Sequence, residues 1–408
     1  MIKNIRDFID FIDIIRLQVC KYLKMLSDLL YIKDYRNYWK YLIIIGAYYA
    51  LPSLQFVIFQ EITDDQDLCY FNEKCMFPVG NIDAFNNVIS NIFYCIYAIT
   101  FIGIVKYNSR KRLLNEIDSD PSIYYALGTG LFLEGIFSGI FHVCPSALNF
   151  QFDTTFMFFG IALSFLALYQ KRHPKELPSA FRTYMFLSIV VLLNLLPLLD
   201  STIYLEVWSW IFFYILTVYV LISGTIHIYF GELLYSNNLN NSKNIFQQIK
   251  IIWRSSTRSN AKLALVFFMF ITTISLMIVA QVNQHIFFTN WVLALFTCNM
   301  LVYYLYYIIQ KILHKEWVSI WKCLSMIICL SVLSTALVVF EIPVTDKLLP
   351  HNESNALNKH CVLFDYWDYH DLWHILSATG LFMFLCNIYF LDTDTQELYN
   401  EDSPYPVF

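Results

Sequence analysis

The stretch Leu263–Val282, LALVFFMFITTISLMIVAQV, decides the fold class of this sequence. It contains no charged residue, and its length is about the 20 residues that an α-helix needs to cross the hydrocarbon core of a bilayer. The rest of the chain has the same character: 58% of the 408 residues are hydrophobic and 14% are charged, with a mean hydropathy of +0.51. Soluble domains carry about 25% charged residues. The sequence therefore predicts an all-α, multipass helical membrane protein.

Ten segments have the length and composition of a membrane span. They cover residues 41–60, 86–105, 123–142, 154–170, 183–199, 207–230, 263–282, 291–311, 317–340 and 370–391. No signal-peptide pattern precedes the first span, so we expect that span to act as its own insertion signal. The sequence is divided accordingly into a basic amphipathic segment at 1–40, a transmembrane domain at 41–391 and an acidic tail at 392–408.

The distribution of Lys and Arg predicts the orientation in the membrane. Residues 1–40 and the segments 106–122, 171–182, 231–262 and 311–316 together hold 23 of the 27 basic residues. With ten spans, all of these segments fall on one side. Positive charge collects on the cytosolic side of membrane proteins, so we expect both termini in the cytosol.

The loops on the opposite, lumenal side carry features of an oxidising compartment. Four of the ten cysteines lie in or beside these loops: Cys69, Cys75, Cys144 and Cys361. They allow two disulfides in any of three pairings. The loop 341–369 also contains Asn352-Glu-Ser, an acceptor sequence for glycosylation, and we predict that Asn352 is modified.

Polar residues inside the predicted spans mark a candidate site, because ionisable groups are expensive in a membrane. The third span holds Glu134, Ser138 and His142 at intervals of four, which places them along one stripe of a helix. Asp153 precedes the fourth span on the same side, at the depth where His142 ends the third. We interpret Glu134 as a partner for a neighbouring helix rather than as a chemical group.

The last span opens with two histidines, His370 and His374, on one helix face. This spacing lets two imidazoles share one zinc ion, and His142 would complete the three-histidine set of a catalytic zinc with an open position. Taken alone, His142 is more simply explained as a hydrogen-bonded interior histidine. The pair alone is equally explained as an interfacial cap of the helix start, where we expect Asp371 to cap the helix.

The same residues carry a family resemblance. The order Ser138-x-x-x-His142, Asp153 and His370-x-x-x-His374 resembles the CREST superfamily of membrane hydrolases, near the lumenal side of the membrane. Longer stretches resemble the systemic-RNA-interference-defective (SID) transmembrane family: 49–52, 67–75, 84–91, 142–154, 172–174, 370–377 and 391–394.

The resemblance to the SID family implies uptake or intracellular transport of double-stranded RNA and, in some members, handling of cholesterol or other sterols. It implies a zinc site held by His142, His370 and His374, with Ser138 and Asp153 beside it. Members of the family act in the plasma membrane or in endosomal and lysosomal membranes. They usually carry a large β-rich ectodomain and one further span before the region present here. We therefore expect either a fragment or a member reduced to its membrane core, and a homodimer stays open.

Three functions are compatible with these features. In a hydrolase of lipid amides or esters, zinc would activate water, Asp153 would accept and pass on the proton, and Ser138 would stabilise the water or an oxyanion. In a transporter or transport accessory, zinc would tie the third and last spans together. A sterol-binding scaffold is the third interpretation, because the spans are rich in aromatic residues. Membrane lipids are partners in each, whereas RNA contact rests on the resemblance alone, since the lumenal loops are acidic.

Overall fold

The computed structural model describes residues 37–63, 69–112, 121–173, 179–199, 203–234, 260–282, 288–316, 318–347 and 349–393. Most of the predicted N-terminal segment at 1–40 and of the acidic tail at 392–408 lies outside these described residues. Within the described ranges the chain is almost entirely helical, and its only β-structure is two isolated bridges.

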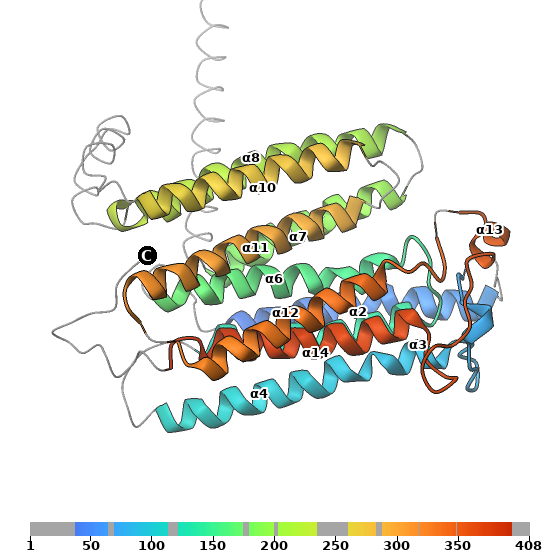
Figure 1. The fold of residues 1–408 in the computed structure, drawn as a ribbon. Helices are drawn as coiled ribbons and strands as arrows, with labels where there is room; N and C mark the ends of the chain where they lie inside the picture. Colours follow the sequence, from blue (N-terminus) through green and yellow to red (C-terminus); the bar gives the residue numbers. More distant parts are fainter. Residues whose placement is uncertain are drawn as a thin grey trace, which may run out of the picture.

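Ten long helices follow one another along the described part of the chain. They are α2 (Tyr38–Thr63), α4 (Ile92–Arg112), α5 (Ser122–Phe141), α6 (Phe150–Arg172), α7 (Ala180–Leu199), α8 (Ile203–Leu234), α10 (Asn260–Val282), α11 (Phe288–Leu313), α12 (Ile320–Phe340) and α14 (Tyr369–Phe390). Two short helices, α3 (Phe85–Ser90) and α13 (His351–Asn355), lie in the connections. Figure 1 shows the long helices running side by side, so that their ends gather at two ends of one bundle.

The helices have the length and composition of membrane spans. Among the described residues, eight are long and apolar enough to cross a bilayer: α2, α3 continued by α4, α5, α6, α10, α11, α12 and α14. Helices α7 and α8 add shorter apolar stretches at Ala180–Leu195 and Val207–Ile222. The predicted fold class, an all-α multipass membrane protein, is confirmed.

The outward faces of the helices are suited to lipid. Phe267 and Phe268 on α10 are 59% and 57% exposed, and Trp321 on α12 is 75% exposed. Soluble monomers rarely expose large contiguous apolar patches. Their exposure is the pattern expected of lipid-facing side chains, whereas the polar residues discussed below face the interior of the bundle.

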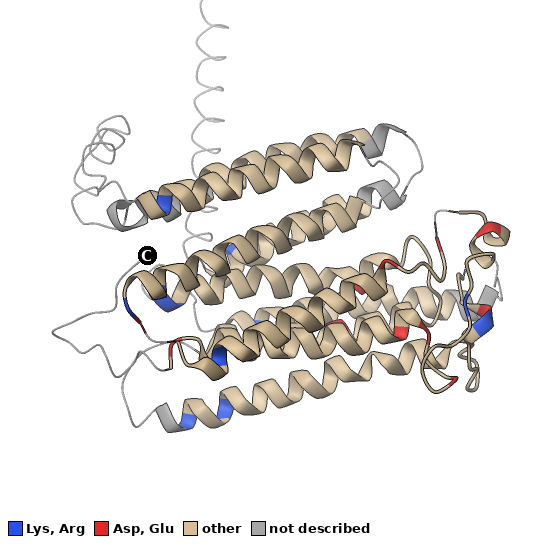
Figure 2. Cartoon of the chain, in the orientation of Figure 1, with Lys and Arg blue, Asp and Glu red and all other residues tan. Residues whose placement is uncertain are grey.

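The two ends of the bundle differ in charge, as Figure 2 shows. At one end, which we call the basic end, the C-terminal ends of some helices and the N-terminal ends of others carry positive charge. These residues are Lys106, Arg110, Lys171, Arg172, Arg182, Lys262, Lys311 and Lys322. The other end, here the disulfide end, contains the connections that precede α3, follow α5 and precede α14. The structure joins Cys69 to Cys144 and Cys75 to Cys361, one of the three pairings that the sequence allowed.

A small residue lets α5 approach its neighbours closely at the disulfide end. A Cβ atom added to Gly135 would lie 2.9 Å from the backbone oxygen of Asn91 and 2.8 Å from the sulfur of Cys95. Small residues allow membrane helices to approach closely and pack by van der Waals contact. This contact holds the residues that follow α3 against α5, next to the candidate site.

Candidate metal centre

The first element of the site is the end of α5. The helix ends at Phe141, and His142 is its C-cap, with its backbone N–H donating to the oxygen of Ser138 at 3.1 Å. Two residues later the chain is fixed by the disulfide from Cys144 to Cys69. The His142 side chain is therefore held between a helix end and a covalent bridge, and it is 4% exposed.

The second element is the start of α14, which is fixed by a reciprocal cap. The Asp371 N–H donates to Asp368 Oδ1 at 2.9 Å, and the Asp368 N–H donates to Asp371 Oδ2 at 3.1 Å. The N-cap residue is therefore Asp368, and Asp371, which we expected to cap the helix, completes the capping box from the third helical position. The same carboxylate accepts hydrogen bonds of 3.0 Å each from the side-chain amides of Asn86 and Asn87. These bonds tie α14 to α3, and they set the direction in which His370 and His374 project.

The structure brings the three predicted histidines together. His142, His370 and His374 each offer a ring nitrogen, and these atoms all lie within 4.8 Å of one another. The closest pair is His142 Nε2 and His374 Nε2, at 3.2 Å. The His370 Nε2 atom is buried, and among the described residues it has no hydrogen-bond partner. Three converging imidazoles with an unpartnered nitrogen form a donor set that could hold a metal ion.

A hydroxyl group orients one of these rings. Ser90 Oγ donates to the backbone oxygen of Asn87 at 2.8 Å. The same oxygen lies 2.7 Å from His374 Nδ1, and the Asn91 amide nitrogen lies 3.4 Å from that ring atom. Because Nδ1 is engaged by these groups, Nε2 is the ring nitrogen of His374 that faces His142. Such an outer hydrogen bond, which fixes tautomer and ring orientation, is usual for histidine ligands. Sequence reasoning missed Ser90, although it lies in one of the stretches that resemble the SID family.

The remaining predicted residues are buried nearby but are not part of the tight cluster. Ser138 on α5 and Asp153 in the first turn of α6 are 1% and 8% exposed. Neither belongs to the group of ligand atoms within 4.8 Å, and the Ser138 hydroxyl lies next to the Asp153 carboxyl. Glu134 faces α6, where Asp153 and Met157 are its neighbours. The chemical roles predicted for Ser138 and Asp153 stay predictions.

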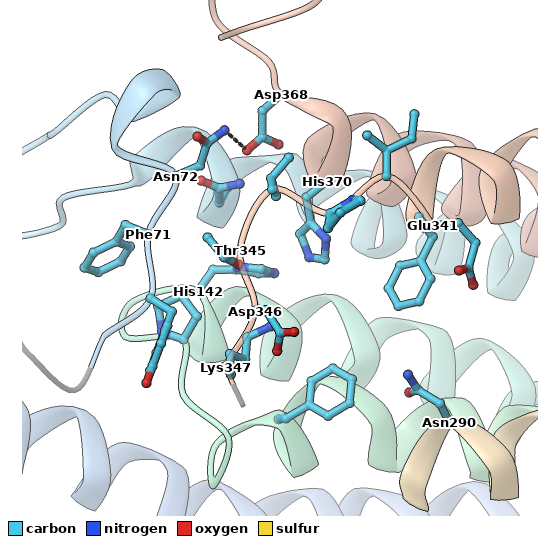
Figure 3. Close-up of a pocket in the computed structure, with 18 residues that line it drawn as sticks. Phe71, Asn72, His142, Asn290, Glu341, Thr345, Asp346, Lys347, Asp368 and His370 are labelled. Atoms are coloured by element: carbon cyan, nitrogen blue, oxygen red, sulfur yellow. Dashed lines mark hydrogen bonds between the residues drawn. The ribbon is translucent and has the colours of Figure 1, made fainter. Parts of the chain in front are cut away.

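A cavity of about 310 Å³ leads to the cluster from the disulfide end. His142 and His370 line it, together with Lys347 from the connection after α12, as Figure 3 shows. Burial lowers the pKa of the Lys347 ammonium, and the carboxylates of Asp153 and Asp346 oppose that effect. The sequence showed Lys347 only as an isolated basic residue in an acidic loop, so its place at the cavity was not predicted.

The glycosylation acceptor lies on the same end of the molecule. The side chain of Asn352 in α13 is exposed. Ser354, the third residue of the acceptor sequence, is buried, and its hydroxyl oxygen accepts from the Asp346 N–H at 2.9 Å. Modification of Asn352 stays a prediction.

Comparison with known proteins connects this site to a family. Residues 4–403 match the family model described as "dsRNA-gated channel SID-1". SID1 transmembrane family member 1 from Rattus norvegicus is 30% identical over 401 residues, and the human protein is 29% identical over 398; each match covers 91% of this chain and 47% of the relative. "Cholesterol uptake protein 1" from Caenorhabditis elegans is 27% identical over 379 residues, which cover 86% of this chain and 48% of that protein. The chain thus spans about half the length of the curated relatives it matches, and it belongs to the SID-1 RNA channel family.

Proposed function

We propose that this chain takes part in the uptake or transport of double-stranded RNA across a membrane, and that a zinc ion held by three histidines is part of its working structure. The proposal rests on one observation: the imidazoles of His142, His370 and His374 converge within 4.8 Å in a chain that matches the RNA channel family over residues 4–403. The disulfide end would face the lumen or the cell exterior, where disulfides persist, in the plasma membrane or an endosomal or lysosomal membrane.

The three histidines would act as a clamp between separate helices. His142 ends α5 and the other two open α14, so a shared ion would join helices that are far apart in the sequence. Zinc bound by imidazoles contributes structural free energy and, with one position open, can activate water. Ser90 and the Asp368–Asp371 cap would hold the rings in place before the ion binds.

The test combines metal content with RNA uptake. Purified protein should contain zinc in an equimolar amount, and His374→Ala should lose it. Cells that express the chain should take up labelled double-stranded RNA above the level of empty cells, and His374→Ala should abolish this gain. The matched control is His360→Ala, which removes an exposed histidine from the same end. No uptake by correctly located protein would reject the transport function, whereas undiminished uptake by a zinc-free variant would reject the role of the metal.

A second candidate function is hydrolysis of a lipid amide or ester, as in the CREST superfamily. The supporting observation is that the buried Ser138 hydroxyl and Asp153 carboxyl lie on the paired helices α5 and α6, beside the helix end that carries His142. Asp153 would accept a proton from the attacking water and return it to the leaving group, and Ser138 would donate a hydrogen bond to the developing oxyanion. Asp153→Asn should then abolish fatty-acid release from ceramide or phospholipid while zinc content stays unchanged.

A sterol-binding role is supported by the name of the Caenorhabditis elegans relative. The aromatic helix faces provide surfaces on which a sterol could pack. Photocrosslinking of a sterol probe to the chain in membranes tests this role. If unlabelled cholesterol does not reduce the crosslinking, the role is rejected.

A further inference from the structure

Two tight turns lie next to each other at the disulfide end, one before α3 and one before α14. The first, residues 79–82, is closed by two backbone hydrogen bonds of 2.9 and 3.2 Å, and the second, residues 363–367, by two of 3.0 and 3.2 Å. The disulfide between Cys75 and Cys361 joins the segments that lead into them, and Figure 1 shows these segments side by side. We call the two turns the paired turns. They belong neither to the histidine cluster nor to the cavity beside it.

The second turn has a strained backbone. Phe364 has a φ of +55° and Asp365 a φ of +50°, so both central residues lie in the left-handed region. A bulky residue adopts this region rarely, and turns of this kind favour Asn and Gly there. The first turn follows that rule, because its residue with positive φ is Gly80, at +62°. An aromatic ring is thus kept where Asn or Gly would be less strained, and strain of this kind is typical of functional sites.

The same aromatic ring is held in the open. Phe364 is 83% exposed, more than any other large apolar side chain among the described residues. Val79 in the first turn and Val362 beside the second are also exposed. Single exposed apolar residues are common on protein surfaces. Exposure at the tip of a strained turn is different, because the ring neither packs against the protein nor eases the backbone, so its contact lies outside the chain.

The paired turns lie where the membrane spans begin. The apolar span formed by α3 and α4 starts at Phe85, three residues after the first turn, and α14 starts at Tyr369, two residues after the second. Trp and Tyr collect at the boundary between the hydrocarbon core and water. Tyr366 and Trp367 in the second turn, followed by Tyr369, fit this pattern. The tip that carries Phe364 is therefore at the level of the lipid headgroups.

The helix below the paired turns presents an apolar face to the bilayer. Ile92, Ile96 and Ile99 follow one another along one face of α4, and all three are exposed. The ring of Tyr366 packs against Phe77, in the segment before α3, with 4.7 Å between the ring centroids. The second turn therefore lies on the side of α14 that faces α3 and α4, so the exposed ring and the lipid-facing row of α4 belong to one side of the bundle.

We propose that the paired turns are an interfacial anchor, which inserts the Phe364 ring among the lipid headgroups on the disulfide side of the membrane. An aromatic ring gains free energy on leaving water, and the bilayer boundary is the apolar surface nearest to this tip. The exposed carboxylate of Asp365 beside the ring disfavours an anionic surface, so the matching lipid is zwitterionic, such as phosphatidylcholine. The anchor would hold the start of α14, and with it His370 and His374, at a fixed depth. The inference goes beyond the proposed function and requires neither RNA nor a metal ion.

The first test identifies what the ring touches. Phe364→p-benzoylphenylalanine places a photoreactive ring at the same position of the full chain, which is then reconstituted in phosphatidylcholine nanodiscs and illuminated. Mass spectrometry should find phospholipid adducts at position 364, and also in Val79→p-benzoylphenylalanine. The matched control is Glu353→p-benzoylphenylalanine, at an exposed position of α13 that is at the same end but not next to a span, where no adduct should form.

The second test separates an anchor from a turn that is merely strained. Phe364→Asn removes the ring and also relieves the backbone, because Asn tolerates positive φ. Without an anchor, relief of strain should slow the hydrogen exchange of residues 363–367. With an anchor, loss of the ring should speed that exchange in phosphatidylcholine nanodiscs. Asp365→Asn keeps the ring and is the matched control, in which exchange should not become faster.

Three results would overturn the proposal. They are the absence of lipid adducts at position 364 of folded protein, equal adduct formation at position 353, and slower exchange in Phe364→Asn. Adducts with a protein in cell membranes, formed in place of lipid adducts, would overturn it as well, because they would identify the paired turns as a protein-docking site.

Discussion

The two ends of the bundle both bury charged or polar side chains, but they do so in opposite ways. At the basic end, the Arg172 guanidinium donates to both carboxylate oxygens of Glu316 at 2.8 and 2.5 Å. Lys311 donates to Asp392 at 2.7 Å and to Glu316 at 3.0 Å, and the Tyr307 hydroxyl donates to Asp392. We call these five residues the ion network.

The ion network is complete within the chain, whereas the histidine cluster is not. The network contains two cations and two carboxylates, each charge has an opposite partner, and all five residues are at most 8% exposed. At the disulfide end, His370 Nε2 is buried without a hydrogen-bond partner among the described residues. Buried polar groups are nearly always satisfied, so the unpartnered nitrogen of His370 supports a ligand at the histidine cluster, whereas the fully paired ion network is a structural joint.

Breaking the ion network should give the largest loss of stability. Arg172→Met leaves Glu316 buried without its bidentate partner, and removing one member of a buried ion pair costs about 3–5 kcal/mol. The free energy of unfolding in detergent should fall by that amount. Arg110→Met, which removes an exposed arginine from the same end, should change it by less than about 0.5 kcal/mol. Equal effects of the two variants would contradict the comparison.

Removing a disulfide should weaken the other end and disturb the site as well. The double variant Cys75→Ser, Cys361→Ser frees the connection before α14, and loss of a native disulfide costs about 2–5 kcal/mol. We expect a lower unfolding temperature together with reduced zinc content. The control is Cys323→Ser, which changes an exposed free cysteine. A variant that retained full zinc content would show that the histidine cluster is held without the bridge.

Ser90→Ala should affect metal binding more than stability. The variant removes the hydroxyl that lies 2.7 Å from His374 Nδ1, and loss of such an outer partner lowers metal affinity about 10–100-fold. Competition with a chelator measures the affinity. Ser377→Ala, which alters a buried hydroxyl on α14 that bonds Tyr94 and not a histidine ring, provides the comparison. Unchanged zinc affinity in Ser90→Ala would show that the tautomer is fixed in another way.

Acid should empty the histidine cluster before it breaks the ion network. Burial alone would raise the pKa of Asp392, but Lys171, Arg172 and Lys311 outweigh it and lower the pKa to about 2. The folded pKa is below the ordinary value of 3.8, so the unfolded chain binds more protons and Asp392 contributes stability above pH 3.8 that is lost as pH falls towards 2. Free imidazoles protonate near pH 6.5, so zinc should leave at much milder acidity.

Zinc content and the free energy of unfolding, measured against pH on the same sample, give the pH range of zinc release and the pH range in which stability falls. Asp392→Asn should remove part of the fall in stability between pH 3.8 and 2 without moving the release of zinc. Simultaneous loss of metal and of folded protein near pH 6 would contradict the separation of the two ends.

The spans and the histidine cluster could be predicted because their signals are local. Stretches such as Leu263–Val282 are fixed by composition, and His370 and His374 share a helix face by spacing alone. His142 joined them because alternate spans return the chain to the same side of the membrane. The fourth span, predicted at 154–170, begins at Phe150, so Asp153 lies within its first turn rather than before it.

The parts that could not be predicted depend on contacts between distant segments. Arg172 and Asp392 are 220 residues apart, and the charge of Arg172 was already explained by the distribution of Lys and Arg. Nothing local in the sequence distinguishes Lys347 from other loop lysines. Its position at the cavity, next to the rings of Phe141 and Phe150, depends on the tertiary fold. The disulfide pairing could not be chosen either, since all four cysteines were expected on the same side.

The distance in sequence between the halves of the disulfide end has a consequence for biogenesis. Cys75 and Cys361 are 286 residues apart. The side-chain amides of Asn86 and Asn87 donate to Asp371, which belongs to the last span. While the ribosome is still delivering the middle spans to the translocon, the early segment therefore carries an open thiol and unmet amide donors. If the last span inserts wrongly, the thiol and the amides stay unpaired and remain accessible to the quality-control machinery of the secretory pathway. Correct insertion of the final helix therefore completes both the site and the disulfide end.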